Sequence, residues 1–136
     1  MREFGQHLTI DASSCERKRL VDQSLIYDIL NNLPAKLCMH SMTLPHVVKW
    51  LDPGATIPGI SGFVMIAESH ISIHTFPEKD YVFIDVFSCK SFDVDSAAKL
   101  LIGAFGAKKS IKNVVVRGAD FPRSHPEHIY PITVDQ

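Results

Sequence analysis

The chain has few cysteines, no excess of charge of either sign and no long apolar run. Its three cysteines, Cys15, Cys38 and Cys89, are far apart and include no C-x-x-C pair, which argues against a disulfide framework and a structural zinc knuckle. The 14 Lys and Arg residues balance 15 Asp and Glu residues, so the sequence lacks the basic field typical of nucleic-acid binding. No apolar stretch reaches the roughly 18 residues of a membrane-spanning helix. These absences favour a small molecule, or a second copy of the chain, as partner.

The 136 residues and the apolar content of 46% are typical of one domain with a single core. The first residues, MREFGQHL, lack the basic and then apolar layout of a secretion signal. We therefore expect a cytoplasmic protein that does not bind a membrane.

The first part of the chain predicts a strand followed by a helix. Residues 5–11 partly alternate between apolar and polar, as a strand does. Ser13 with Glu16 matches a capping box at the start of a helix. Apolar residues then recur at helical spacing until Pro34, which is expected to close the helix.

The middle of the chain is rich in strand-forming residues. A second strand is expected over residues 37–44 and could continue past Pro45 over residues 47–51. Residues 52–59 hold two prolines and two glycines, and this composition predicts a loop. Three β-branched and aromatic segments follow, at residues 60–67, 70–75 and 81–88.

A second helix and a last strand complete the expected domain of residues 1–120. Asp93 can cap a helix that ends near Phe105, and residues 111–116 suit a strand. Residues 121–136 contain several prolines and are expected to form a tail. The order of elements predicts an α+β fold, a two-layer α/β sandwich with a mostly antiparallel sheet and two helices packed on one face.

The stretch AESHISIHTFPE, residues 67–78, places a serine after an acid and two histidines in an expected strand. A metal site is one interpretation, but His70 and His74 would lie roughly 13 Å apart in an extended strand, too far to share one ion. A hydrolase is another, although no G-x-S-x-G motif surrounds Ser69. Taken singly, these are ordinary strand residues, and Cys89 is a small core residue. A serine that acts on its own backbone is the remaining interpretation.

Four separated motifs together resemble one family. They are ESHISIHTFPE at residues 68–78, DVFSC at 85–89, GISG at 59–62 and GQHL at 5–8. This set is similar to the short prokaryotic S-adenosylmethionine decarboxylases, which are made as proenzymes and depend on a pyruvoyl group. The resemblance spans roughly residues 5–118.

The resemblance implies that the chain cuts itself between Glu68 and Ser69. The products would be a β chain, residues 1–68, and an α chain, residues 69–136. Ser69 attacks the preceding carbonyl through its hydroxyl, the peptide becomes an ester, and elimination and hydrolysis leave a pyruvoyl group. The family uses this ketone in place of pyridoxal phosphate, as the electron sink of a Schiff base with the substrate amine.

Three further residues match family positions with chemical roles. Ser61 matches the donor that stabilises the oxyanion of the first step. His74 matches the base that removes the Cα proton of residue 69. Cys89 matches the proton donor in turnover, a task suited to a thiol whose pKa is about 8.5. The product would be decarboxylated S-adenosylmethionine for spermidine biosynthesis.

The spacing of Ser69 and His74 bears on oligomeric state. Five residues of extended strand span roughly 16 Å, so the two side chains cannot touch within one chain. We therefore expect a homodimer with two shared sites, each built from Ser69 and Cys89 of one chain and Ser61 and His74 of the other. A bend or bulge after Ser69 is the alternative for a monomer.

Substrate contacts follow from the resemblance as well. Glu78 matches the carboxylate that holds the ribose hydroxyls, and Phe76 stands where many members have tryptophan, although core packing would explain it equally. Trp50 precedes the glycine-containing loop where a stacking aromatic is expected. No metal is implied. A pyruvoyl-dependent decarboxylase of arginine or ornithine, and an uncleaved homologue without catalysis, stay open as alternatives.

Overall fold

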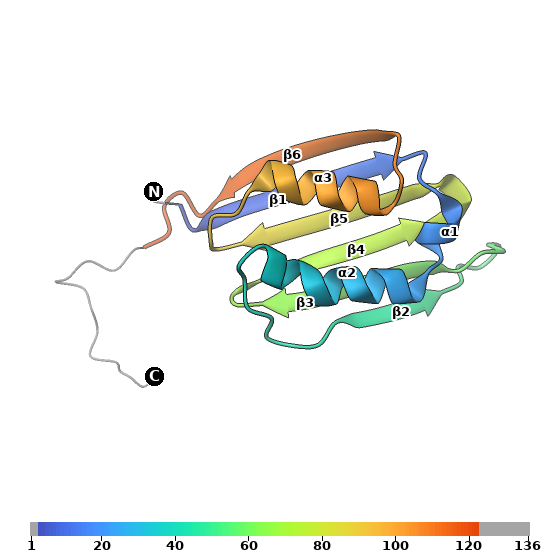
Figure 1. Cartoon of the computed structure of the whole chain (residues 1–136), viewed down its shortest axis with the longest axis horizontal. Coiled ribbons are helices and arrows are strands. Elements are labelled where there is room, and N and C mark those ends of the chain that lie inside the picture. The colour runs from blue at the N-terminus through green and yellow to red at the C-terminus, as the bar shows by residue number, and fades with distance from the viewer. Residues whose placement is uncertain (1–2, 123–136) are drawn as a thin grey trace.

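The chain folds into one antiparallel sheet with its two long helices on the same side (Figure 1). The computed structural model describes residues 3–122. The strands lie in the order β2-β3-β4-β5-β1-β6, and each neighbouring pair is antiparallel. Their bounds are Gly5–Ser13 (β1), His46–Trp50 (β2), Gly59–Ile66 (β3), Ser69–Phe76 (β4), Tyr81–Ser88 (β5) and Lys109–Arg117 (β6).

The two long helices cover different parts of the sheet. Helix α2, Gln23–Lys36, contacts β2, β3 and β4, whereas α3, Val94–Ala104, contacts β1 and β6. The short helix α1, Arg17–Leu20, contacts the 3-10 turn η1, Pro77–Lys79, at one end of the sheet (Figure 1). The expected two-layer α+β sandwich with an antiparallel sheet is confirmed.

Burial alternates along the strands because successive side chains point to opposite faces. In β4, Ile71 and Ile73 are buried beneath the helices, whereas His70 and His74 are exposed. The face without helices is called the open face below. Its residues include Ser61, Phe63 and Met65 of β3, His70, Ser72, His74 and Phe76 of β4, Phe83, Asp85 and Phe87 of β5, and His7 and Thr9 of β1.

The boundaries of the first helix differ from the expectation. Ser13 is no helix cap, because it is the last residue of β1 and pairs with β6. The helix is instead divided, and Asp22 caps α2 by accepting a hydrogen bond from the backbone nitrogen of Leu25 at 3.0 Å. Pro34 does not close the helix but lies inside its last turn, and α2 continues to Lys36. A proline so close to the end disturbs few of the helical hydrogen bonds.

The prediction of a strand over residues 37–44 is wrong. The segment is a connection that reaches β3 through an isolated bridge. Met39 is buried in the core, but Met42 and Leu44 are 60% and 71% exposed. The apolar spacing therefore reflects one core contact, and it does not mark the buried face of a strand.

The second half of the chain follows the expectation closely. The β3–β4 and β4–β5 hairpins are present, and Asp93 caps α3 by accepting a hydrogen bond from the backbone nitrogen of Ser96 at 3.0 Å. Residues 123–136, which make up most of the expected tail, lie outside the described residues. Between residues 3 and 122, no helix has the length and apolar character needed to cross a membrane.

Thr75 connects the buried side of the sheet to α1. Its Oγ1 accepts a hydrogen bond from the backbone nitrogen of Ile60 and donates one to the carbonyl of Leu20, both at 2.9 Å. Thr75→Val keeps the shape but leaves two buried backbone groups without partners, so the free energy of unfolding should fall by about 2–4 kcal/mol. Denaturant titration measures this. The control Thr9→Val, on the open face, should change it by less than about 0.5 kcal/mol, and equal effects would contradict the prediction.

Candidate active site

The hydroxyl of Ser69 has an unusual environment at the β3–β4 hairpin. Ser69 is the first residue of β4 and follows the turn formed by Ala67 and Glu68. It pairs with Ile66, which faces the core. Its Oγ is buried and has no hydrogen-bond partner among the described residues. Such a group is rare because it costs about 1–3 kcal/mol, and here it leaves the oxygen lone pairs free one residue after Glu68.

The thiol of Cys89 lies at the same hairpin. Cys89 follows the last residue of β5, and its Sγ donates a weak hydrogen bond to the carbonyl of Ala67 at 3.6 Å. The other two cysteines are placed differently. Cys15 is buried, and burial, reinforced by the charge of Asp80, raises the pKa of its thiol to about 11. Cys38 is exposed. Among residues 3–122, Cys89 is the thiol whose sulfur hydrogen-bonds to the β3–β4 hairpin, at the residue before Glu68.

Ser61 and His74 form a second cluster on the open face. They are directly opposite in the β3–β4 pairing, and Ser61 Oγ lies 2.8 Å from His74 Nδ1. The hydrogen bond orients the imidazole, and both side chains are exposed. A hydroxyl and an imidazole in contact can serve as a donor and a base for one reacting group.

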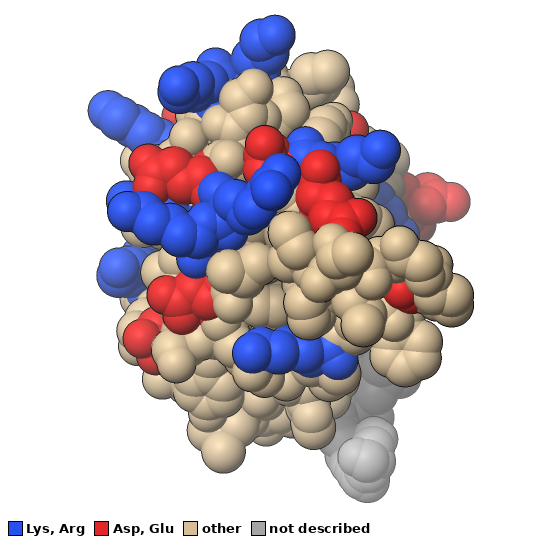
Figure 2. Space-filling model, turned by 90° about the vertical axis from the view of Figure 1, so that its right-hand side faces the viewer, with Lys and Arg blue, Asp and Glu red and all other residues tan. Residues whose placement is uncertain are grey.

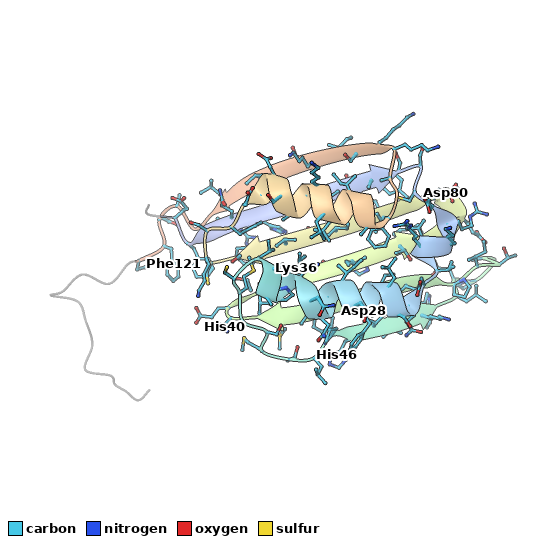
Figure 3. The ribbon with its side chains drawn as sticks, in the orientation of Figure 1. Asp28, Lys36, His40, His46, Asp80 and Phe121 are labelled. Carbon is cyan, nitrogen blue, oxygen red and sulfur yellow. The ribbon has the colours of Figure 1, made fainter. Side chains whose placement is uncertain are left out.

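The two clusters do not meet within one chain. The pairing of β4 with β5 runs without a bulge from His70 to Phe76, so Ser69 and His74 are separated by roughly 16 Å. Figure 3 shows His40, whose carbonyl accepts a hydrogen bond from the hairpin residue Ala67, at one end of the sheet and Asp80 at the other. The bend that a monomer would need is therefore not present in β4.

A cavity of about 390 Å³ adjoins the Ser61–His74 pair. Its lining includes all three residues expected to contact substrate, Trp50, Phe76 and Glu78. The Trp50 indole donates a hydrogen bond to Asp52 Oδ1 at 2.8 Å. Phe76 is 45% exposed and packs edge-on against Phe83, so it is not a core residue. The structure thus brings together residues that the sequence places far apart.

Glu78 is held by the loop between β2 and β3. Its Oε2 accepts hydrogen bonds from the backbone nitrogen of Thr56, the hydroxyl of Thr56 and the backbone nitrogen of Ile57, at 2.7, 2.7 and 3.1 Å. The bonds from Thr56 lower the pKa of Glu78 below 4.5. Because the folded pKa is the lower one, this contribution to stability is present above about pH 4.5 and is lost as the pH falls through the folded value.

The open face also carries a polar network that the sequence did not reveal. Asp85 accepts hydrogen bonds from His7 Nε2 at 3.0 Å and from Ser72 Oγ at 3.2 Å. Arg117 lies 3.2 Å from the other nitrogen of His7 and stacks over the ring of Phe87. Alternating polar residues in β4 and β5 were a weak signal, because only the register shows that they meet.

Charges of both signs share the end of the molecule that carries α1 and η1. Figure 2 shows Lys and Arg side chains there interleaved with Asp and Glu. Two ion pairs belong to this region, Arg17 with Asp80 and Arg19 with Glu16. This end therefore presents no field of a single sign.

Known proteins resemble this chain in fold and sequence. It aligns with the crystal structure of the adenosylmethionine decarboxylase from Aquifex aeolicus with a TM-score of 0.74 and 25% identity, over 92% of this chain and 99% of that one. The family model of S-adenosylmethionine decarboxylase matches residues 6–118. The S-adenosylmethionine decarboxylase proenzyme of Pyrococcus furiosus is 31% identical over 121 residues, which cover 88% of this chain and 83% of that protein.

A further proenzyme of the same name, from Methanococcus vannielii, is 36% identical over 89 residues, which cover 65% of this chain and 68% of that protein. Both sequence and fold thus agree with the resemblance inferred from the motifs. The chain belongs to the S-adenosylmethionine decarboxylase family.

Proposed function

We propose that this chain is a proenzyme that cuts itself between Glu68 and Ser69 and then decarboxylates S-adenosylmethionine for spermidine synthesis. The observation that carries the proposal is the buried Ser69 hydroxyl, which has no partner among the described residues and directly follows the bond to be cut. The family assignment supports the substrate. The orphaned hydroxyl also fits the precursor of a pyruvoyl group.

The proposed processing uses four groups: the Ser69 hydroxyl, the carbonyl of Glu68, Ser61 and His74. Ser69 Oγ attacks the carbonyl carbon of Glu68, and the C–N bond breaks as the C–O bond of an ester forms. Ser61 donates a hydrogen bond to the oxyanion of this step. His74, oriented by Ser61, then takes the Cα proton of residue 69, and the ester C–O bond breaks to release the new C-terminal carboxylate of Glu68. Water hydrolyses the remaining dehydroalanine to the pyruvoyl group, and the nitrogen of residue 69 leaves as ammonia.

Two copies of the chain are needed to bring these groups together. Each copy carries Ser69 and Cys89 at one end of the sheet and Ser61 and His74 toward the other. A two-fold axis between two open faces would place the hairpin of one copy against the Ser61–His74 pair of the other. The exposed apolar side chains of the open face support this contact; they include Phe63, Met65 and Phe83.

In turnover the pyruvoyl group supplies a ketone that takes up the electrons released with carbon dioxide. The chain's own residues bind the substrate and protonate the carbon that loses carbon dioxide. Trp50 and Phe76 present aromatic faces to the cavity, and Glu78 presents a carboxylate. Cys89, beside the hairpin, delivers the proton that replaces the carboxyl group.

Release of labelled carbon dioxide from carboxyl-labelled substrates tests the assignment. We expect release from S-adenosylmethionine at a rate at least about 100-fold above that from arginine or ornithine, because the cavity combines aromatic faces with a carboxylate suited to an adenosyl group. Release from arginine or ornithine alone would overturn the assignment of S-adenosylmethionine as the substrate. No release from any of the three, by an intact chain, would indicate a homologue without catalysis.

A further inference from the structure

The loop of residues 51–58 forms one wall of the cavity without any strand pairing of its own. It joins β2 to β3 and contributes Asp52, Ala55 and Ile57 to the lining. Among residues 3–122, side-chain hydrogen bonds attach it to the flanking elements at two points: the Trp50 indole donates to Asp52, and the Glu78 carboxylate accepts from Thr56 and Ile57. The shape of the wall therefore depends on a few polar contacts.

Thr56 supplies two of the three hydrogen bonds that reach Glu78. Its backbone nitrogen and its hydroxyl both lie 2.7 Å from Oε2, and the backbone nitrogen of Ile57 adds a third bond at 3.1 Å. All three converge on one oxygen. No hydrogen bond from the described residues reaches the other oxygen, Oε1. The clamp thus fixes the carboxylate while leaving half of its acceptor capacity free.

Thr56 itself does not line the cavity, whereas Glu78 does. Glu78 is exposed and lies on the short turn η1, so without a partner its side chain would sample several rotamers. The hydroxyl of Thr56 removes this freedom at no cost to cavity volume. Its effect on a bound ligand is therefore indirect, through Glu78 and through the loop residues that line the cavity.

We propose that Thr56 is a positioning residue that holds the Glu78 carboxylate and the loop wall in the geometry that binds a ribose diol. The inference rests on the proposed function, because it takes the adenosyl part of the substrate as the occupant of the cavity. It goes further by assigning specificity for the two ribose hydroxyls to a side chain outside the cavity. The hydrogen bonds from Thr56 also lower the pKa of Glu78, so the carboxylate stays ionised to a more acidic pH than an ordinary glutamate.

Trp50 offers a readout that does not require catalysis. It is the only tryptophan of the chain and it lines the cavity, so its fluorescence reports binding there. The probe is 5′-methylthioadenosine, which has the ribose diol but no carboxyl group to lose. Thr56→Val removes the hydroxyl and keeps the backbone nitrogen, and we expect Kd to rise about tenfold, because binding must then order a freer Glu78 side chain.

Three comparisons separate positioning from a general effect on the loop. Thr56→Ser should restore Kd to within about twofold of the unaltered protein, because the hydroxyl returns. Thr43→Val, a matched change outside the cavity lining, should leave Kd unchanged. The 2′,3′-dideoxy form of the probe should bind the unaltered protein and Thr56→Val equally.

In Thr56→Val the loss of affinity at low pH should also begin at a higher pH, because the pKa of Glu78 rises.

Equal Kd values for the unaltered protein and Thr56→Val would overturn the proposal. So would an equal loss for the diol and dideoxy probes, or failure of the unaltered protein to bind the diol probe. Binding that follows the expected pattern in a protein that releases no carbon dioxide from S-adenosylmethionine would overturn the proposed function and leave the role of Thr56 standing.

Discussion

The Ser69→Ala variant should remain one intact species of 15.2 kDa under denaturing conditions, whereas the unaltered chain should separate into residues 1–68 and 69–136. Alanine has no hydroxyl to attack the carbonyl of Glu68, so neither the cut nor the pyruvoyl group can form. Decarboxylation should fall by about a thousandfold or more, because the electron sink is missing. Mass spectrometry of the denatured protein measures cleavage, and release of carbon dioxide measures activity.

A matched control removes a different buried serine. Ser88 ends β5 next to Cys89, is 1% exposed, and its Oγ accepts a hydrogen bond from the backbone nitrogen of Lys90. Ser88→Ala should still be cut after Glu68. Cleavage of Ser69→Ala, or an unmodified serine in the folded unaltered chain after prolonged incubation, would end the account of self-processing.

Co-expression of Ser69→Ala with His74→Ala should restore activity that neither variant has alone. In a shared-site dimer, one site of the mixed pair combines both defects, while the other combines the intact Ser69 of one chain with the intact His74 of its partner. Random pairing makes about half of the dimers mixed, so about a quarter of the normal sites should be active. The measurement is the rate of carbon dioxide release per mole of chain.

The control pairs two defects from the same half of the site. Ser69→Ala with Cys89→Ala should stay inactive, because Ser69 and Cys89 lie at the same hairpin and no mixed site receives both intact. Activity in this pair would contradict the prediction that each site takes Ser69 and Cys89 from the same chain. A His74→Ala chain that cuts itself fully as a monomer would show that no partner is needed.

Local sequence signals predicted the helices and strands in the second half of the chain well. The segment expected over residues 81–88 is β5, and Asp93 caps α3, since β-branched runs and caps act over a few residues. The strand expected over residues 37–44 failed because exposed Met42 and Leu44 look like core residues in a sequence. Ser13 was misassigned because the same residue types end strands and cap helices.

The candidate site was predictable only in part. The sequence suggested candidate residues because a short run holds Glu68, Ser69 and His74 together with motifs that resemble a family. The clamp of Thr56 on Glu78 was missed, since the two lie 22 residues apart and loop sequences give little sign of their contacts.

The sequence by itself determined which atoms could react, a serine hydroxyl behind an acidic residue, and that Ser69 and His74 in one extended strand are too distant to touch. The tertiary structure decided which groups become neighbours, such as Ser61 with His74 across β3 and β4. The reason is that chemistry and spacing along a strand are local properties of the chain. Register is fixed by burying alternate residues against helices elsewhere in the chain, and it exists only once the sheet has formed.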